Sequence, residues 1–218
     1  MDFGIIAKNY IVLLKGVQVT LYVSFFSILI GSLCSILLGI VFVAGSRPVK
    51  TVISAYIFVM RGLPFLLIVF VIFYVLPFLG IRLSAIASGI LSLTLYFVAT
   101  GTEIVRGSIQ AVSKGQYEAA YALGMTYWEA MRWAILPQAL ISMVPPFMNE
   151  FVYLLKGSSV VSIAGVPDLM GRGKEIIERE FRGFEILLTI GVIYYCLSVA
   201  FTYGGKRLEK RLAFKMSR

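Results

Sequence analysis

Long apolar runs alternate with short polar segments along this chain. A helix needs about 20 mostly apolar residues to cross a bilayer, and only Arg61 and Glu150 interrupt the five longest apolar runs with charge. These runs are Gly16–Ser46, Thr51–Ile81, Leu83–Thr102, Trp133–Leu155 and Ile186–Gly205. We expect each run to form a membrane-spanning helix. The pattern therefore predicts an all-α, polytopic membrane protein with five transmembrane helices.

Two further segments are too short to span. Residues Phe3–Leu14 predict a short helix at the membrane surface, and the apolar stretch Gly157–Met170 predicts a re-entrant or interfacial segment. The expected organisation is an N-terminal extracytoplasmic segment at residues 1–15, then a transmembrane domain at 16–205 with a polar loop at about 107–137. A basic tail at 206–218 follows.

Composition supports the membrane as the solvent of this chain. Of 218 residues, 59% are hydrophobic and 14% are charged, whereas soluble domains carry roughly 25% charged residues. The chain has no histidine, which excludes histidine-based catalysis and histidine metal ligation. Cys34 and Cys196 lie far apart in apolar runs, which favours two buried thiols over a disulfide or a metal site.

The distribution of lysine and arginine predicts the orientation. The tail after Gly205 has six basic residues and one acid, the loop after the first run has Arg47 and Lys50, and the insert after the third run has three more basic residues. A five-span arrangement puts these segments on one side, which the positive-inside rule makes cytoplasmic. The N-terminus is then outside and the C-terminus inside. The net charge of +9 indicates orientation and attraction to anionic lipid rather than a nucleic-acid partner.

The polar insert after the third run predicts two short helices. Ser113-x-x-Gln116 and Thr126-x-x-Glu129 match the capping box that opens a helix. Gly124 lies between them, where the first helix would end, so a turn is expected at about 124–126. Small and aromatic residues in this insert leave two interpretations open, a solvated loop and a docking surface for another protein. Pro137 predicts a kink or restart into the fourth span.

Several motifs together carry a resemblance to a known family. Glu118-Ala119-Ala120, Gly124 and Leu136-Pro137 resemble the EAA loop of the membrane subunits of bacterial binding-protein-dependent ABC importers. The phrase GQYEAAYALGM…LPQA resembles the polar amino-acid branch of that family. Four shorter motifs agree, namely Arg61-Gly62-Leu63-Pro64, Glu103–Gly107, Pro145-Pro146 with Asn149-Glu150-Phe151, and Lys156-Gly157-Ser158-Ser159.

The resemblance covers about residues 16–212 and implies a function and a set of partners. It implies a permease subunit in the bacterial inner membrane, forming the path for a polar amino acid or related small zwitterion. It also implies that Glu118, Ala119, Ala120 and Gly124 couple the chain to a cytoplasmic ATPase dimer. A second permease chain and an extracytoplasmic substrate-binding protein complete the implied assembly. Residues 96–100 depart from the branch's pattern, so the substrate stays open.

The resemblance further implies that this chain performs no chemistry of its own. The sequence contains no G-x-x-x-x-G-K-[ST] phosphate loop, so ATP and Mg²⁺ are expected on the partner ATPase. No cofactor or metal is expected on this chain. Two alternative functions are an ion-coupled secondary carrier, which predicts an internal inverted repeat, and a membrane anchor or sensor without a transport path.

Polar residues inside the predicted spans are the candidate path residues, because ionisable groups in a membrane are functional hypotheses by default. Glu150 and Asn149 follow two prolines and would either contact a substrate or, for Glu150, pair with Arg61 or Lys156. Arg61 would be a carboxylate clamp or a packing residue.

The third predicted span adds two further groups of candidates. Glu103 and Arg106, three residues apart on one helical face, would form a structural or gate pair. Tyr96, Thr100 and Thr102 would line the path or make helix contacts.

Overall fold

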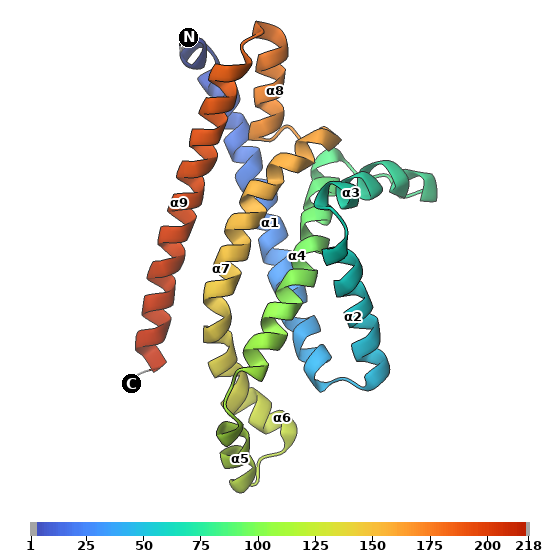
Figure 1. The fold of residues 1–218 in the computed structure, drawn as a ribbon, viewed down its shortest axis with the longest axis vertical. Helices are drawn as coiled ribbons and strands as arrows, with labels where there is room; N and C mark the ends of the chain where they lie inside the picture. Colours follow the sequence, from blue (N-terminus) through green and yellow to red (C-terminus); the bar gives the residue numbers. More distant parts are fainter. Residues whose placement is uncertain (1–3, 217–218) are drawn as a thin grey trace.

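The computed structural model describes residues 4–216, with the side chains of 4–207 and Glu209, and every regular element among them is helical. This confirms the predicted all-α class. Long helices run side by side, and the two ends of the chain lie at opposite ends of the molecule (Figure 1). The α-helices are α1 (Gly4–Ala44), α2 (Arg47–Gly62), α3 (Phe65–Phe70), α4 (Ala85–Gln110), α5 (Lys114–Ala122), α6 (Tyr127–Ala130), α7 (Leu136–Val161), α8 (Leu169–Glu180) and α9 (Gly183–Met216).

Three helices in the described part of the chain are long and apolar enough to cross a membrane. They are α1, α4 and the Gly183–Arg207 part of α9, and the bent pair formed by α2 and the segment Phe65–Leu79 would make a fourth. Helix α7 occupies the predicted fourth span and is long enough to cross, but its polar residues make it less apolar than these helices. The count of five spans therefore stays a prediction.

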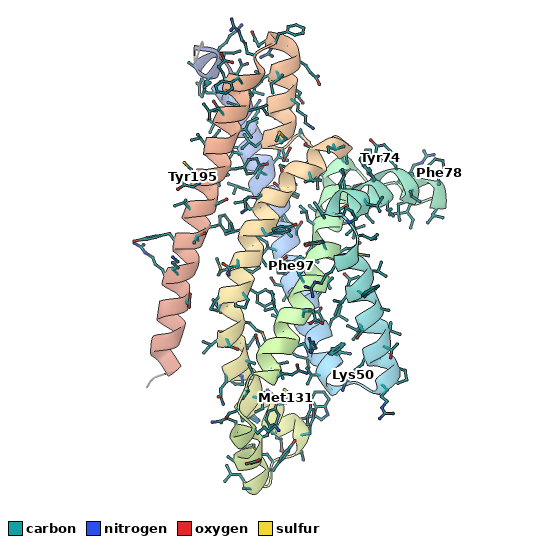
Figure 2. The ribbon with its side chains drawn as sticks, in the orientation of Figure 1. Lys50, Tyr74, Phe78, Phe97, Met131 and Tyr195 are labelled. Atoms are coloured by element: carbon teal, nitrogen blue, oxygen red, sulfur yellow. The ribbon has the colours of Figure 1, made fainter. Side chains whose placement is uncertain are left out.

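The predicted second span is not one straight helix. It breaks after Gly62, and the chain turns by 105° into α3. Pro64 has no backbone N–H and forces the preceding residue out of the helical region, and Leu63 is indeed extended at φ −89° and ψ 142°. Figure 2 shows Tyr74 and Phe78 on the arm that projects sideways beyond α3. An apolar run conceals such a break, because hydropathy does not register the missing N–H.

The two segments predicted to be too short to span have different bounds in the structure, and their placement at the membrane stays a prediction. Phe3 lies outside the described residues, but residues 4–14 belong to α1, which runs unbroken from Gly4 to Ala44 because this stretch contains no helix-breaking residue. The stretch Gly157–Met170, predicted to be re-entrant or interfacial, is divided among three elements. Its first residues complete α7, a 3₁₀ turn (Ser162–Ala164) follows, and α8 begins at Leu169.

The main core lies where α1, α4 and α7 cross. Phe97 is fully buried at its centre (Figure 2) and stacks on Phe147 with ring centroids 5.8 Å apart. A side-chain carbon added at Gly31 of α1 would lie 2.5 Å from the Phe97 ring, so a glycine is needed for this close approach. Both cysteines are free, but the predicted burial is wrong, since Cys34 is only half-buried and Cys196 is exposed on α9.

The arrangement gathers the basic segments at one end of the molecule. The α1–α2 connection, the α5–α6 unit and the C-terminus of α9 lie toward the lower end in Figure 1, whereas α8 and the start of α1 lie at the upper end. The charge asymmetry of the sequence thus matches a spatial asymmetry of the fold. The orientation inferred from it stays a prediction.

Candidate functional site

The α5–α6 unit contains the four residues predicted to couple to an ATPase. Gly124 follows α5 in the left-handed region at φ +77°. Its N–H donates to the Tyr121 carbonyl at 2.9 Å, and the Met125 N–H donates to the Ala120 carbonyl at 3.1 Å. These two bonds form a Schellman motif, which ends a helix and favours glycine at this position. The predicted turn is therefore present, and its backbone geometry explains the glycine.

One of the two predicted capping boxes forms. The Glu129 N–H donates to the Thr126 hydroxyl at 3.4 Å, and the Glu129 carboxylate accepts from the Thr126 N–H at 2.8 Å. The bonds from the Thr126 backbone and hydroxyl lower the pKa of Glu129. The box at Ser113 does not form, because the Gln116 side chain instead accepts a hydrogen bond from Gln138 at 3.0 Å.

Three of the four predicted coupling residues are at the surface. Glu118, Ala119 and Gly124 are exposed, whereas Ala120 is only 3% exposed and packs inside the unit. A hollow of about 320 Å³ adjoins them, lined by Leu123, Gly124, Met125, Glu129 and Trp133. Exposed apolar residues that rim a hollow are typical of a docking surface for another protein.

The aromatic and apolar residues of this insert divide between inside and outside. Met131 is buried where the unit joins the main bundle (Figure 2), and Tyr127 packs against the main core. Leu123 and Trp133 are 78% and 66% exposed, and the Arg132 guanidinium lies 4.9 Å from the Trp133 ring. The exposed surface of this unit is therefore partly apolar and partly basic.

A second cluster of predicted residues lies between α2, α4 and α7. The Glu150 carboxylate is within hydrogen-bonding reach of the Thr100 hydroxyl and is influenced by the charge of Arg61. Tyr96 stacks on Tyr153, with ring centroids 5.8 Å apart. The fold thus brings Arg61, Tyr96, Thr100 and Glu150 together. Tyr153 is a member that the sequence interpretation missed, although its place three residues after Glu150 puts it on the same face of α7.

Other predicted path residues do not join this cluster. Thr102 is fully buried and donates to the Val98 carbonyl at 2.6 Å, so it serves helix packing. Asn149 is exposed on α7. Lys156 is exposed and lines a different groove, against α9, so the charged neighbour of Glu150 is Arg61 rather than Lys156.

Two prolines distinguish the backbone of α7 near this cluster. Pro145 and Pro146 both lie inside the helix. Because proline has no N–H, the carbonyls of Ile141 and Ser142, four residues earlier, lack their helical donors. Free carbonyls inside a membrane are tolerated where they face protein or a water-filled cavity, which supports a polar path along α7.

Glu103 and Arg106 form the predicted ion pair. Arg106 Nη2 lies 2.6 Å from Glu103 Oε2, and both side chains are partly buried. Arg106 also donates to Gln110 at 3.0 Å and lies 5.7 Å from the Phe42 ring centroid. Glu103 and Arg61 both line a hollow of about 370 Å³ between α2 and α4. The structure contains the ion pair of Glu103 and Arg106, and the action of this pair as a gate stays a prediction.

A buried carboxylate that the sequence interpretation missed lies at the start of α8. Asp168 is 0% exposed, accepts from the Gly171 N–H at 2.8 Å and accepts from the Tyr194 hydroxyl at 3.2 Å. Burial raises the pKa of Asp168 to about 6, against the opposing effect of these bonds and of Lys174. An aspartate directly before an apolar helix start is a sequence signal for such a cap.

Within the described residues, no group of three or more histidine, cysteine, aspartate or glutamate side chains is placed to hold a metal ion. The described geometry contains an exposed helix–turn–helix unit at one end and a cluster of polar residues between α2, α4 and α7. That this chain binds no cofactor stays a prediction.

The chain is similar to known proteins in both sequence and fold. Residues 10–214 match the family model described as the inner membrane component of binding-protein-dependent transport systems. The chain is 32% identical to the glutamine transport system permease protein of Escherichia coli (strain K12), over 97% of both chains. It is 32% identical to the arginine transport system permease protein of Bacillus subtilis (strain 168), again over 97% of both.

Solved structures show the same fold. A crystal structure of an amino acid ABC transporter with histidines superposes with a TM-score of 0.92 at 34% identity, covering 97% of this chain and 99% of that one. An inward-facing MetNI methionine ABC transporter gives a TM-score of 0.79 at 21% identity, covering 94% and 98%. The second likeness is one of fold alone.

Proposed function

The chain belongs to the inner membrane components of binding-protein-dependent transport systems, and we propose that it forms the translocation path of an ATP-driven importer for a polar amino acid or related small zwitterion. The observation that carries this proposal is the pairing, in one chain, of an exposed helix–turn–helix unit at one end with the polar cluster around Glu150 inside the bundle. The relatives named above are permeases for glutamine and arginine.

The mechanism that follows is alternating access. ATP closes a pair of cytoplasmic ATPase subunits, which hold the α5–α6 unit through Glu118, Ala119 and Gly124. Because this unit continues through a π-helical turn (Met131–Ile135) into α7, its motion is transmitted to the helix that carries Asn149 and Glu150. This route supports coupling between ATP hydrolysis and the polar path. The chain itself is a transporter component, and hydrolysis belongs to a separate subunit.

The remaining parts of the proposal concern assembly and placement. An importer permease requires an ATPase and a substrate-binding protein as partners, and we include a second permease chain, identical or related, as the other half of the path. We place the chain in a bacterial inner membrane with five spans, the N-terminus outside and the C-terminus inside. The basic end of the molecule, which contains the α5–α6 unit (Figure 1), supports this orientation.

The test is ATP-driven uptake of radiolabelled glutamine and arginine by the reconstituted complex. We expect Gly124→Arg and Glu118→Lys to abolish uptake and weaken ATPase association. Glu178→Lys is the matched control, since it makes the same charge change at an exposed position on α8, and it should leave ATPase association intact. Uptake that continues without the ATPase would indicate a secondary carrier. Normal uptake with Glu150→Ala would favour an anchor without a path.

A further inference from the structure

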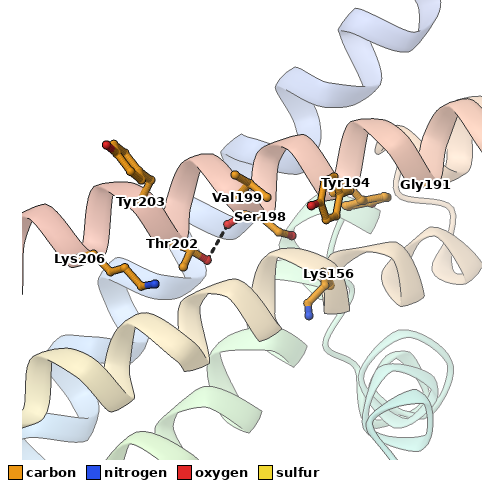
Figure 3. Close-up of a pocket in the computed structure, with 9 residues that line it drawn as sticks. Lys156, Gly191, Tyr194, Ser198, Val199, Thr202, Tyr203 and Lys206 are labelled. Carbon is orange, nitrogen blue, oxygen red and sulfur yellow. Dashed lines mark hydrogen bonds between the residues drawn. The ribbon is translucent and has the colours of Figure 1, made fainter.

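A groove of about 570 Å³ separates α7 from α9 on a face of α7 other than that of the Glu150 cluster. Its volume is in the range of small-molecule sites. Figure 3 shows Lys156 from α7 opposite the side chains of α9. The lining residues that matter here are Lys156, Tyr194, Ser198, Thr202 and Lys206. The last four form a polar stripe along α9, and Lys156 belongs to α7.

No acidic side chain lines this groove among the described residues. Among the carboxylates of neighbouring elements, Glu150 is affected by the charge of Arg61, and Asp168 accepts hydrogen bonds from Gly171 and Tyr194. Lys156 lies within α7, more than a turn before its end. Lys156 is exposed to the groove, and no ion pair joins it to a carboxylate among the described residues, so its ammonium group is available to an anion from outside this chain.

The hydroxyl groups of the groove indicate where that negative group would lie. The Thr202 hydroxyl donates to the Ser198 carbonyl at 2.8 Å (dashed line in Figure 3), and Tyr194 donates to Asp168. Ser198 Oγ, by contrast, is shielded from solvent and has no hydrogen-bond partner. A shielded hydroxyl without a partner is unfavourable. The groove thus contains two cations, Lys156 and Lys206, and one free donor, Ser198.

We propose that this groove binds the carboxylate of the transported zwitterion, with Lys156 as its counter-charge and Ser198 as a hydrogen-bond donor. The inference rests on the proposed function. Glutamine, arginine and cystine, the cargoes named for relatives, have different side chains but share an α-amino group and an α-carboxylate. Arg61, the other candidate carboxylate clamp, lines a different hollow, so the cations of this groove are Lys156 and Lys206.

Because of their spacing along α7, the Lys156 groove and the Glu150 cluster would contact a substrate one after the other. Glu150 and Lys156 are six residues apart, which is about 9 Å of helical rise. Six residues also turn the helix by about 240°, so the two side chains lie on different faces of α7, and only Lys156 lines the groove. Lys156 is nearer to α8, and a substrate delivered at that end would meet the carboxylate station before the glutamate.

The test measures binding of radiolabelled L-glutamine to the permease–ATPase complex in phosphatidylcholine nanodiscs, with L-glutaminamide, which lacks the carboxylate, as competitor. Wild-type complex should prefer glutamine. Lys156→Gln should weaken glutamine binding by about tenfold or more, because a charge-assisted hydrogen bond is lost, and should leave glutaminamide unchanged. Lys156→Arg should restore most of the preference. Lys50→Gln, at the start of α2 and outside the groove (Figure 2), is the matched control.

Three results would overturn the inference. In the first, Lys156→Gln keeps the full preference for glutamine while the complex still transports. In the second, the wild-type complex transports but binds both probes equally. In the third, the effect of Lys156→Gln appears only when phosphatidylglycerol is added, which would assign Lys156 to a lipid phosphate. All three leave the proposed function standing, whereas loss of ATP-driven uptake by the wild-type complex would remove both.

Discussion

Replacement of Asp168 by asparagine is expected to stabilise the protein at neutral pH. Asp168 lies before α8, outside the apolar spans, and is 0% exposed. Asparagine has nearly the same shape and can still accept the hydrogen bond from the Gly171 N–H as a helix cap. The substitution therefore removes a buried charge while the cap of α8 and the contact region of Tyr194 keep their geometry.

The magnitude follows from the pKa of Asp168, which burial raises from 3.8 to about 6. This difference corresponds to about 3 kcal/mol at 1.36 kcal/mol per pKa unit. Between these two values the folded chain holds a proton that the unfolded chain has released, so the free energy of unfolding falls as pH rises. The contribution is present below about pH 4 and is lost above about pH 6. Asp168→Asn should recover up to about 3 kcal/mol at pH 7.

The assay is thermal unfolding of the purified complex in detergent between pH 4.5 and pH 7.5, for wild type and Asp168→Asn. The difference between the two proteins isolates this carboxylate from others that titrate. We expect the variant to gain stability relative to wild type as pH rises and to level off above pH 6. Asp168→Ala removes the cap as well and should be less stable than Asp168→Asn. A variant less stable than wild type at pH 7 would show that attraction to Lys174 outweighs burial and would refute the reasoning.

Three further substitutions test the local geometry. No atom lies within 4 Å of a carbon added at Gly124, so Gly124→Ala should destabilise the α5–α6 turn only through the cost of a left-handed backbone, about 1–2 kcal/mol. Unchanged hydrogen exchange of the unit would contradict this. Thr126→Ala should cost about 1 kcal/mol through the lost cap with Glu129, seen as faster exchange of the first amides of α6 and not of α5. Gly16→Ala should lower the melting temperature, because the new carbon would lie 2.8 Å from Leu169 Cα and overpacking costs about 1–3 kcal/mol; an unaltered melting temperature would mean that α1 and α8 separate without strain.

Some features were readable from the sequence because they depend on local chemistry. The turn at Gly124 and the capping box at Thr126 follow from side-chain and backbone requirements within a few residues, and both form. The ion pair of Glu103 and Arg106 follows from helical spacing. The apolar runs likewise predicted an all-helical chain, since a membrane-spanning backbone must satisfy its own hydrogen bonds.

Other features were misread because a pattern does not record geometry. The bend at Pro64 was concealed in an apolar run, and the continuation of α1 back to Gly4 was concealed by a polar start. Ser113-x-x-Gln116 matches a capping box in sequence, but the box does not form. The Gln116 side chain instead accepts a hydrogen bond from Gln138, 22 residues away. Such competition between local and distant partners is decided only by the folded arrangement.

The sequence by itself determined that this chain is helical and apolar, and that it carries a helix–turn–helix unit with the motifs of an importer permease. It also located the charged residues of the apolar runs. Tertiary structure alone decided their partners. It placed Arg61 where its charge acts on Glu150, left Lys156 lining a groove without an acid, and buried Asp168 between α8 and α9. The physical reason is that hydropathy and capping act over a few residues, whereas the energy of a charge depends on every element that packs around it.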